Sequence, residues 1–171
     1  MSIRPFEGHP PALDKPLLAI DIDGVISLFG AEEPPDPSAT RLQLVDGVPH
    51  RISLAAGERL LRLAERFELV WASGWEDKAN FYLPNLLGLP ELAHVSFDGG
   101  ARAGGAHWKL GPLETFGAGR ALAWIDDNFD QSCYDWAEAR AEPTLLVVTE
   151  PHLGLEEAHV DALNAWAGSL H

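Results

Sequence analysis

A length of 171 residues, with 46% hydrophobic and 22% charged residues, is typical of one globular domain and excludes a mainly disordered chain. Twelve Lys and Arg residues against 26 Asp and Glu residues give a net charge of −14, which argues against tight nonspecific binding to nucleic acids and against binding to anionic membrane surfaces. No apolar run is long enough to cross a membrane, and no signal peptide is evident, so we expect a cytoplasmic protein. Cys133 is the single cysteine, so we expect no disulfide within the chain.

The N-terminal segment, residues 1–16, contains four prolines and is expected to lie as an arm on the surface of one domain, residues 17–171. The apolar run at 17–22 that follows the arm predicts a buried strand. Three prolines within 31–38 predict a loop, because proline does not fit a regular strand ladder. The domain is therefore expected to begin with a core strand that leads into a loop.

Residues 41–53 predict a β-hairpin. Two strand-like runs flank the dipeptide Asp46-Gly47, which is a strong signal for a two-residue turn. Pro49 lies in the second run and favours an edge strand there, because proline has no backbone N–H to donate. Ser53 is expected to cap the helix that follows the hairpin.

Beyond the hairpin, short apolar runs alternate with longer amphipathic segments. Four more buried strands are expected, at 68–72, 94–97, 121–125 and 144–148. Helices are expected at 54–67, 131–141 and 155–170, and the segment 77–87 is expected to be helical or irregular around Pro84. The glycine-rich segment 98–106 predicts a loop. This alternation predicts an α/β fold, a Rossmann-like parallel sheet with helices on both faces.

Polar residues that can carry chemistry follow three of the predicted strands, where open α/β sheets bind their ligands: Asp21, Asp23, Ser73, Gly74, Asp126 and Asp127. Bringing four carboxylates together is unfavourable unless a cation binds or protons are retained. An all-oxygen set of ligands suits Mg²⁺. Lys109 would add a positive charge and Ser73 a hydroxyl group, so the set has the parts needed to hold a phosphoryl group.

Four short motifs follow one another along the chain: DIDGV at 21–25, VWASGW at 70–75, Lys109, and WIDDN at 124–128. They resemble, in the same order, the four motifs of the haloacid dehalogenase (HAD) superfamily of phosphohydrolases. The segments LVWASGWEDKAN, LGLP, HWKL and PTLLVVTEP are similar to the HAD domain of Swiss-Army-Knife RNA repair proteins. This resemblance covers most of the chain and implies a HAD-like fold.

The resemblance also implies a role for each matched position. Asp21 would be the nucleophile that forms an aspartyl-phosphate, and Asp23 would be the general acid and base. Mg²⁺ would be held by the acidic residues of the first and fourth motifs, with Asp23 contributing its backbone carbonyl and Asp127 acting directly or through water: Asp21, Asp23, Asp126 and Asp127. The phosphoryl oxygens would be bound by residues of the second and third motifs: Ser73, Gly74 and Lys109.

The implied function is that of a Mg²⁺-dependent phosphatase, a phosphoric monoester hydrolase, with a phosphorylated substrate such as a nucleotide or an RNA end. A phosphotransferase and a non-catalytic phosphate-binding module would use the same residues and stay open as alternatives. Receiver domains use similar residues in a different order, which argues against that class. Only 52 positions separate Asp21 from Ser73 and 36 separate Ser73 from Lys109. No full cap domain fits these gaps, so we expect a capless protein in which the 41–53 hairpin forms a small flap.

Two choices of residue also stay open. Lys78 is a rival of Lys109 for the third motif, although the HWKL context favours Lys109. Trp75 and Trp108 flank the phosphate-binding candidates, and each could stack on a base or sugar of the substrate. Packing against the pocket wall is the favoured role for both tryptophans.

Overall fold

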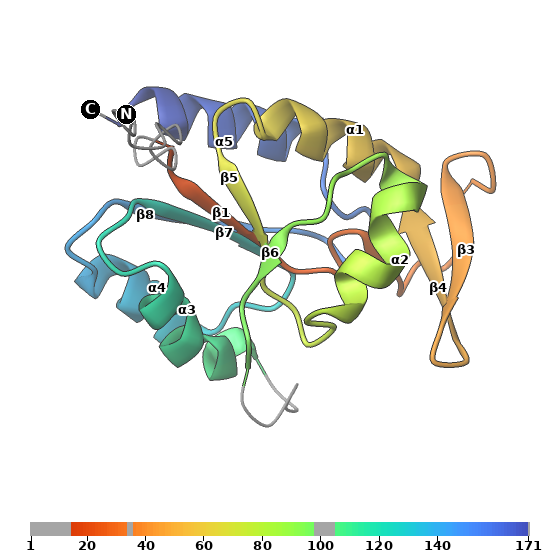
Figure 1. Ribbon diagram of the computed structural model, residues 1–171, viewed down its shortest axis with the longest axis horizontal. Coiled ribbons are helices and arrows are strands. Elements are labelled where there is room, and N and C mark those ends of the chain that lie inside the picture. The colour runs from red at the N-terminus through yellow and green to blue at the C-terminus, as the bar shows by residue number, and fades with distance from the viewer. Residues whose placement is uncertain (1–14, 34–35, 98–104, 171) are drawn as a thin grey trace, which may run out of the picture.

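The computed structural model describes residues 15–33, 36–97 and 105–170. Over these residues the chain forms a mixed α/β structure, in which a five-stranded parallel sheet is flanked by helices on both faces (Figure 1). The arm expected at 1–16 and the loop expected at 98–106 lie outside the described residues, except for the last two positions of each. No helix in the described part of the chain is long and apolar enough to cross a membrane.

The parallel sheet is built from the apolar runs that predict strands. Its strands, in spatial order, are β6 (Ala93–His94), β5 (Glu68–Trp71), β1 (Leu17–Ile20), β7 (Leu122–Asp126) and β8 (Thr144–Val148). The strand expected at 94–97 is shorter than predicted and begins one residue earlier. Because β1 pairs with both β5 and β7, Ile20 lies between Trp71 and Ile125. The carboxyl ends of these three strands therefore meet at one edge of the sheet.

Helices cover the sheet in two layers. One layer consists of α1 (Leu54–Leu63), α2 (Lys78–Leu87) and α5 (Glu157–Gly168), and the other of the 3₁₀ helix η1 (Ala106–Lys109), α3 (Leu110–Phe116) and α4 (Gln131–Ala139) (Figure 1). Alternate strand side chains point to opposite faces, so Leu18 and Ile20 pack under the first layer, and Leu17 and Ala19 under the second. Burial on both faces explains why these strands are continuous apolar runs.

The predicted hairpin belongs to a second, antiparallel sheet, whose order is β2 (Ser27–Leu28), β4 (Val48–Ser53) and β3 (Thr40–Val45). Its turn residues are both left-handed, Asp46 at φ 51° and Gly47 at φ 81°, as a two-residue hairpin turn requires. The expectation that Pro49 marks an edge strand is wrong for β4 as a whole, because β4 is the central strand. Pro49 is tolerated because β2 pairs only with Arg51 and Ile52, which leaves one side of Pro49 open.

The helix starts follow the sequence better than the helix ends. Ser53 caps α1 as predicted, and its Oγ accepts a hydrogen bond from the backbone N–H of Ala56 at 3.3 Å. The predicted helices all end earlier than expected except α2, which runs through Pro84. The helices η1 and α3 are not predicted, because the dipeptide Gly111-Pro112 is typical of a position where a helix ends. Proline is tolerated in the first turn of a helix, where its missing N–H would have no partner within the helix.

Candidate active site

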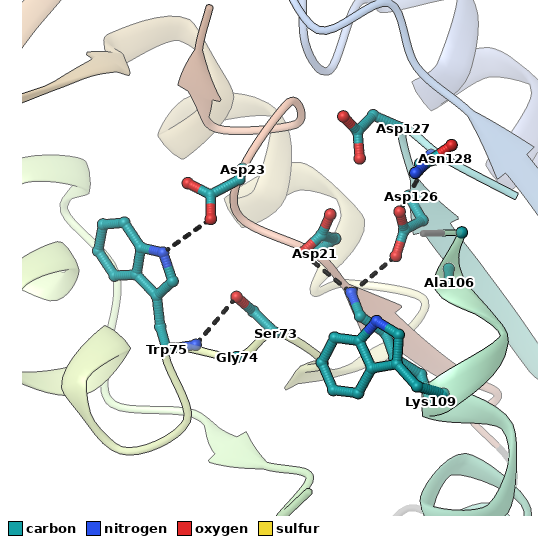
Figure 2. Close-up of a pocket in the computed structure, with 12 residues that line it drawn as sticks. Asp21, Asp23, Ser73, Gly74, Trp75, Ala106, Lys109, Asp126, Asp127 and Asn128 are labelled. Carbon is teal, nitrogen blue, oxygen red and sulfur yellow. Dashed lines mark hydrogen bonds and ion pairs between the residues drawn. The ribbon is translucent and has the colours of Figure 1, made fainter. Parts of the chain in front are cut away.

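The polar residues at the carboxyl edge of the parallel sheet line a cavity of about 330 Å³ (Figure 2). The cavity lies at the carboxyl end of β1, between β5 and β7. The chain runs outward from β1 to β5 and β6 on one side and then crosses to β7 and β8 on the other, and such a switch point is where open α/β sheets bind ligands. The structure brings together there every residue that the sequence singles out for chemistry: Asp21, Asp23, Ser73, Gly74, Lys109, Asp126 and Asp127.

A buried ammonium group links two of the carboxylates in this cavity. Lys109 is the last residue of η1, and its Nζ donates to Oδ2 of Asp126 at 2.8 Å and to the carbonyl of Ala72 at 2.9 Å. The same Nζ lies 3.1 Å from Oδ1 of Asp21 (Figure 2). Asp21, Lys109 and Asp126 are all buried. The three residues therefore form one buried cluster of charges.

Burial dominates the electrostatics of this cluster. Burial raises the pKa of Asp21 well above its usual value, the negative charge of Asp126 raises it further, and Lys109 opposes both effects. Burial alone would lower the pKa of Lys109, but the two aspartates outweigh it and raise that pKa. The lysine therefore stays charged, and the cavity still contains more acidic than basic groups. Such a site favours an additional bound cation.

Three carboxylates are close enough to bind a single metal ion. Asp21, Asp126 and Asp127 each offer one carboxylate oxygen, and these oxygens lie within 4.8 Å of one another. Burial raises the pKa of Asp127 to about 6, and the charge of Asp126 adds to this shift. An all-oxygen set is the kind that hard divalent cations prefer. The carboxylate of Asp23 points away from these three, toward Trp75 (Figure 2).

Short contacts fix the loop that follows β1. Gly24 has φ 82°, and a Cβ at this position would overlap the carboxylate of Asp127. Thr149, just after β8, donates from its Oγ1 to the carbonyl of Gly24 at 2.8 Å. Both the backbone conformation and the close approach of Asp127 therefore require glycine after the DID sequence.

Asp23 lies in a different environment from the other acidic residues. Its side chain is 52% exposed, and its Oδ2 accepts a hydrogen bond from Nε1 of Trp75 at 3.2 Å. Nδ1 of His50, from β4, lies 3.6 Å from Oδ1 of the same carboxylate. The sequence does not single out His50. The available signal is the alternation of β4, which places His50 on the same face of the strand as the buried Ile52.

Ser73 and Gly74 follow β5 and line the cavity beside Asp21. Ser73 is buried, and its Oγ accepts a hydrogen bond from the backbone N–H of Trp75 at 3.2 Å. Within the described part of the chain that hydroxyl donates to no acceptor, so its hydrogen can bind a ligand oxygen. Lys78, the rival candidate for the third motif, lies at the surface in an exposed ion pair, whereas Lys109 lines the cavity.

The two tryptophans of the cavity differ in their surroundings. Trp75 is only 9% exposed, and its indole meets the ring of His50 edge-on with 4.9 Å between centroids. Trp75 therefore packs against the hydrophobic core, and it also lines the cavity. Trp108 is half-buried and meets Phe97 edge-on, also at 4.9 Å, while lining the cavity. Trp108 is the more exposed of the two tryptophans, so it offers more of its ring to a ligand.

No protein-family model matches the chain, and no curated protein matches it. Among solved structures, a hypothetical protein from Xanthomonas campestris is similar over 99% of this chain and 95% of that chain, with 15% sequence identity and a TM-score of 0.42. A likeness at this level carries no conclusion about function. The described residues define a mixed α/β protein with an acidic, lysine-containing cavity at the carboxyl edge of its parallel sheet.

Proposed function

We propose that this chain is a Mg²⁺-dependent phosphomonoester hydrolase of the HAD type, acting through an aspartyl-phosphate. One observation carries this proposal: segments far apart in the sequence bring a buried aspartate, a buried lysine, a serine hydroxyl and a further acidic pair into one cavity. These groups supply a nucleophile, donors for phosphoryl oxygens and ligands for a cation. The resemblance of the four sequence motifs to those of the HAD superfamily supports the same assignment.

Two transfer steps follow from this assignment. In the first, an oxygen of Asp21 bonds to phosphorus and the bond from phosphorus to the ester oxygen breaks, while Asp23 gives its proton to the leaving oxygen. In the second, Asp23 takes a proton from water, and the water oxygen bonds to phosphorus as the bond to Asp21 breaks. Ser73 donates a hydrogen bond to a phosphoryl oxygen, and Lys109 exchanges its contact with Asp21 for a hydrogen bond to the phosphoryl group when substrate binds. The products are an alcohol and inorganic phosphate.

The acidic set fits a hard divalent cation such as Mg²⁺. Asp21, Asp126 and Asp127 would hold the ion, and the resemblance adds the backbone carbonyl of Asp23. When bound, Mg²⁺ would offset the negative charges of the carboxylates and of the phosphoryl group. Two observations support a cation here: all the donors are oxygens, and the pKa values of Asp21 and Asp127 are raised. The raised pKa values mean that these carboxyl groups tend to retain protons when no cation balances their negative charge.

The proposed substrate is a phosphomonoester with a large body, such as a nucleotide or an RNA end. Between β1 and α1, the described residues form only the small sheet of β2, β3 and β4, which is the size of a flap. Between β5 and η1 they form only α2 and β6. A capless protein of this kind leaves its site open to a large molecule.

Turnover of p-nitrophenyl phosphate tests this function. A hydrolase releases p-nitrophenol and inorganic phosphate in equal amounts, and only when Mg²⁺ is present. A phosphotransferase releases less phosphate than p-nitrophenol once an alcohol acceptor is added, and a binding module releases neither product. The Asp21→Asn variant is expected to be folded and inactive, because an amide cannot form the aspartyl-phosphate. Activity at the wild-type level in that variant would contradict the proposed route.

A further inference from the structure

We infer that His50 is a positioning residue of this site, which together with Trp75 holds the carboxylate of Asp23 in the orientation needed for proton transfer. This inference rests on the proposed function, because it assigns a task around the acid of that reaction. His50 lies outside all four motifs and comes from the small antiparallel sheet rather than from the parallel sheet. The small sheet would thus contribute to the chemistry as well as covering part of the domain.

Asp23 needs such support because its side chain is largely exposed and little packing restricts its rotamer. Its side chain is 52% exposed, whereas Asp21 and Asp126 are buried. An exposed carboxylate on a loop can adopt several rotamers, but a general acid must direct its proton at the leaving oxygen. A misplacement of about 1 Å can cost roughly 100-fold in rate. A fixed partner for each carboxylate oxygen therefore has a direct effect on proton transfer.

Trp75 supplies the partner of one oxygen. Its Nε1 donates to Oδ2 of Asp23 at 3.2 Å (Figure 2). The indole cannot easily turn away, because Trp75 is 9% exposed and packs within the hydrophobic core under α1 and α2. The N–H donor of Trp75 therefore has a fixed position, and its hydrogen bond fixes the position of Oδ2 of Asp23.

His50 contacts both members of this pair. Its ring meets the indole of Trp75 edge-on, with centroids 4.9 Å apart and 69° between the planes. Its Nδ1 lies 3.6 Å from Oδ1 of Asp23, the oxygen that Trp75 does not bind. The same Nδ1 is hydrogen-bonded at 2.9 Å to Oγ of Ser27, which is itself buried. One ring nitrogen therefore faces both residues: its hydrogen bond with Ser27 fixes the imidazole, and the fixed imidazole lies beside the carboxylate of Asp23.

The hairpin that carries His50 is anchored at both ends. Ser27 of β2 pairs with Ile52 of β4, which sets the register of His50 relative to the loop containing Asp23. At the turn, Asp46 forms an ion pair with Lys78 at the start of α2. These contacts give His50 a defined position over Asp23, although the two residues belong to different elements.

The test compares two substrates that differ in their need for an acid. p-Nitrophenolate leaves readily without a proton, whereas phenolate leaves poorly without one. Because kcat/KM reports only steps up to the release of the leaving group, a misplaced acid lowers kcat/KM for phenyl phosphate more than for p-nitrophenyl phosphate. His50→Ala is expected to lower the value for phenyl phosphate about tenfold or more, and that for p-nitrophenyl phosphate less than about threefold.

Matched variants separate positioning from folding. Trp75→Phe keeps an aromatic ring beside His50 but removes the N–H donor, and should show the same discrimination between substrates. The double variant should lose less than the product of the two single losses, since both residues act through Asp23. His50→Gln keeps a hydrogen-bonding side chain and should recover part of the loss. Arg51→Ala, at the next residue of β4 and on its other face, is the control and should change neither value.

A second measurement does not depend on activity. The indole N–H resonance of Trp75 is identified by its loss in Trp75→Phe, and it should move in both Asp23→Asn and His50→Ala but stay in place in Arg51→Ala. An unmoved resonance in His50→Ala, or equal losses on the two substrates, would overturn the role of His50 alone. An inactive wild type, or a fully active Asp23→Asn variant, would instead overturn the proposed function.

Discussion

Nζ of Lys109 lies 2.8 Å from Oδ2 of Asp126, and both residues are almost completely buried. The same ammonium group also contacts Asp21 and the carbonyl of Ala72, so each of its three hydrogens has an acceptor. A buried charge that loses its partner is far more costly than an exposed one. The stability of the metal-free chain should therefore depend on this lysine, apart from any role in turnover.

Lys109→Met is expected to lower the free energy of unfolding of the metal-free chain by about 3–5 kcal/mol, because it removes the positive charge that faces two buried aspartates. Urea denaturation at neutral pH with EDTA measures the loss. The matched control is Lys78→Met, which removes an exposed ion pair with Asp46 and should cost about 0–1 kcal/mol. Equal losses in the two variants would show that the buried cluster stabilises the folded chain no more than an exposed ion pair does.

Asp126→Asn is expected to weaken Mg²⁺ binding about tenfold or more while leaving the chain folded, since the amide removes one negative charge from the acidic set. Calorimetric titration with Mg²⁺ measures the affinity. Asp135→Asn, an exposed position on α4, makes the same change in net charge and serves as the control. Unchanged affinity in Asp126→Asn would remove this residue from the metal site.

Metal-free stability should fall as the pH rises through the range in which Asp127 loses its proton. Burial raises the pKa of Asp127 from 3.8 to about 6, so between these values the folded chain holds a proton that the unfolded chain has released. Its contribution to stability is therefore complete below about pH 4 and is lost by about pH 6. The free energy of unfolding of wild type, minus that of Asp127→Asn, should decrease across this range in EDTA. A difference that increases with pH would contradict the assignment.

Trp108→Ala is expected to raise KM for a nucleoside monophosphate about 5- to 150-fold, because stacking on a base is worth about 1–3 kcal/mol. Steady-state kinetics should show little change with p-nitrophenyl phosphate, since the proposed phosphoryl contacts of Ser73 and Lys109 do not involve the indole ring. Trp108→Phe keeps an aromatic face and should retain most of the affinity. Similar losses on both substrates would mean that Trp108 only packs the cavity wall.

The strands and the location of the site could be predicted because both depend on local patterns. Apolar runs identify β1, β5 and β7, and parallel strands bring their carboxyl ends to one edge. The sequence therefore predicts that Asp21, Ser73 and Asp126 come together, and they line one cavity. The bounds are less well predicted, because the helix ends depend on packing as well as on propensity.

Other parts of the site depend on how distant elements pack, which no local pattern specifies. Lys109 reaches the carboxylates through η1, which follows a glycine-rich segment and is not predicted. His50 reaches Asp23 because the small sheet packs beside the loop after β1. Trp75 turns its N–H toward Asp23, a direction that its place after Ser73 does not indicate.

Direct detection of phosphate on Asp21 tests the central claim. The Asp23→Asn variant should complete the first transfer from p-nitrophenyl phosphate in Mg²⁺ and stall before the second, so that the intermediate accumulates. Acid quenching and borohydride reduction convert an aspartyl-phosphate to homoserine, and mass spectrometry of the digested chain locates the change. We predict homoserine at position 21. Turnover by the wild type with an unmodified Asp21, or with the change at another residue, would contradict the account.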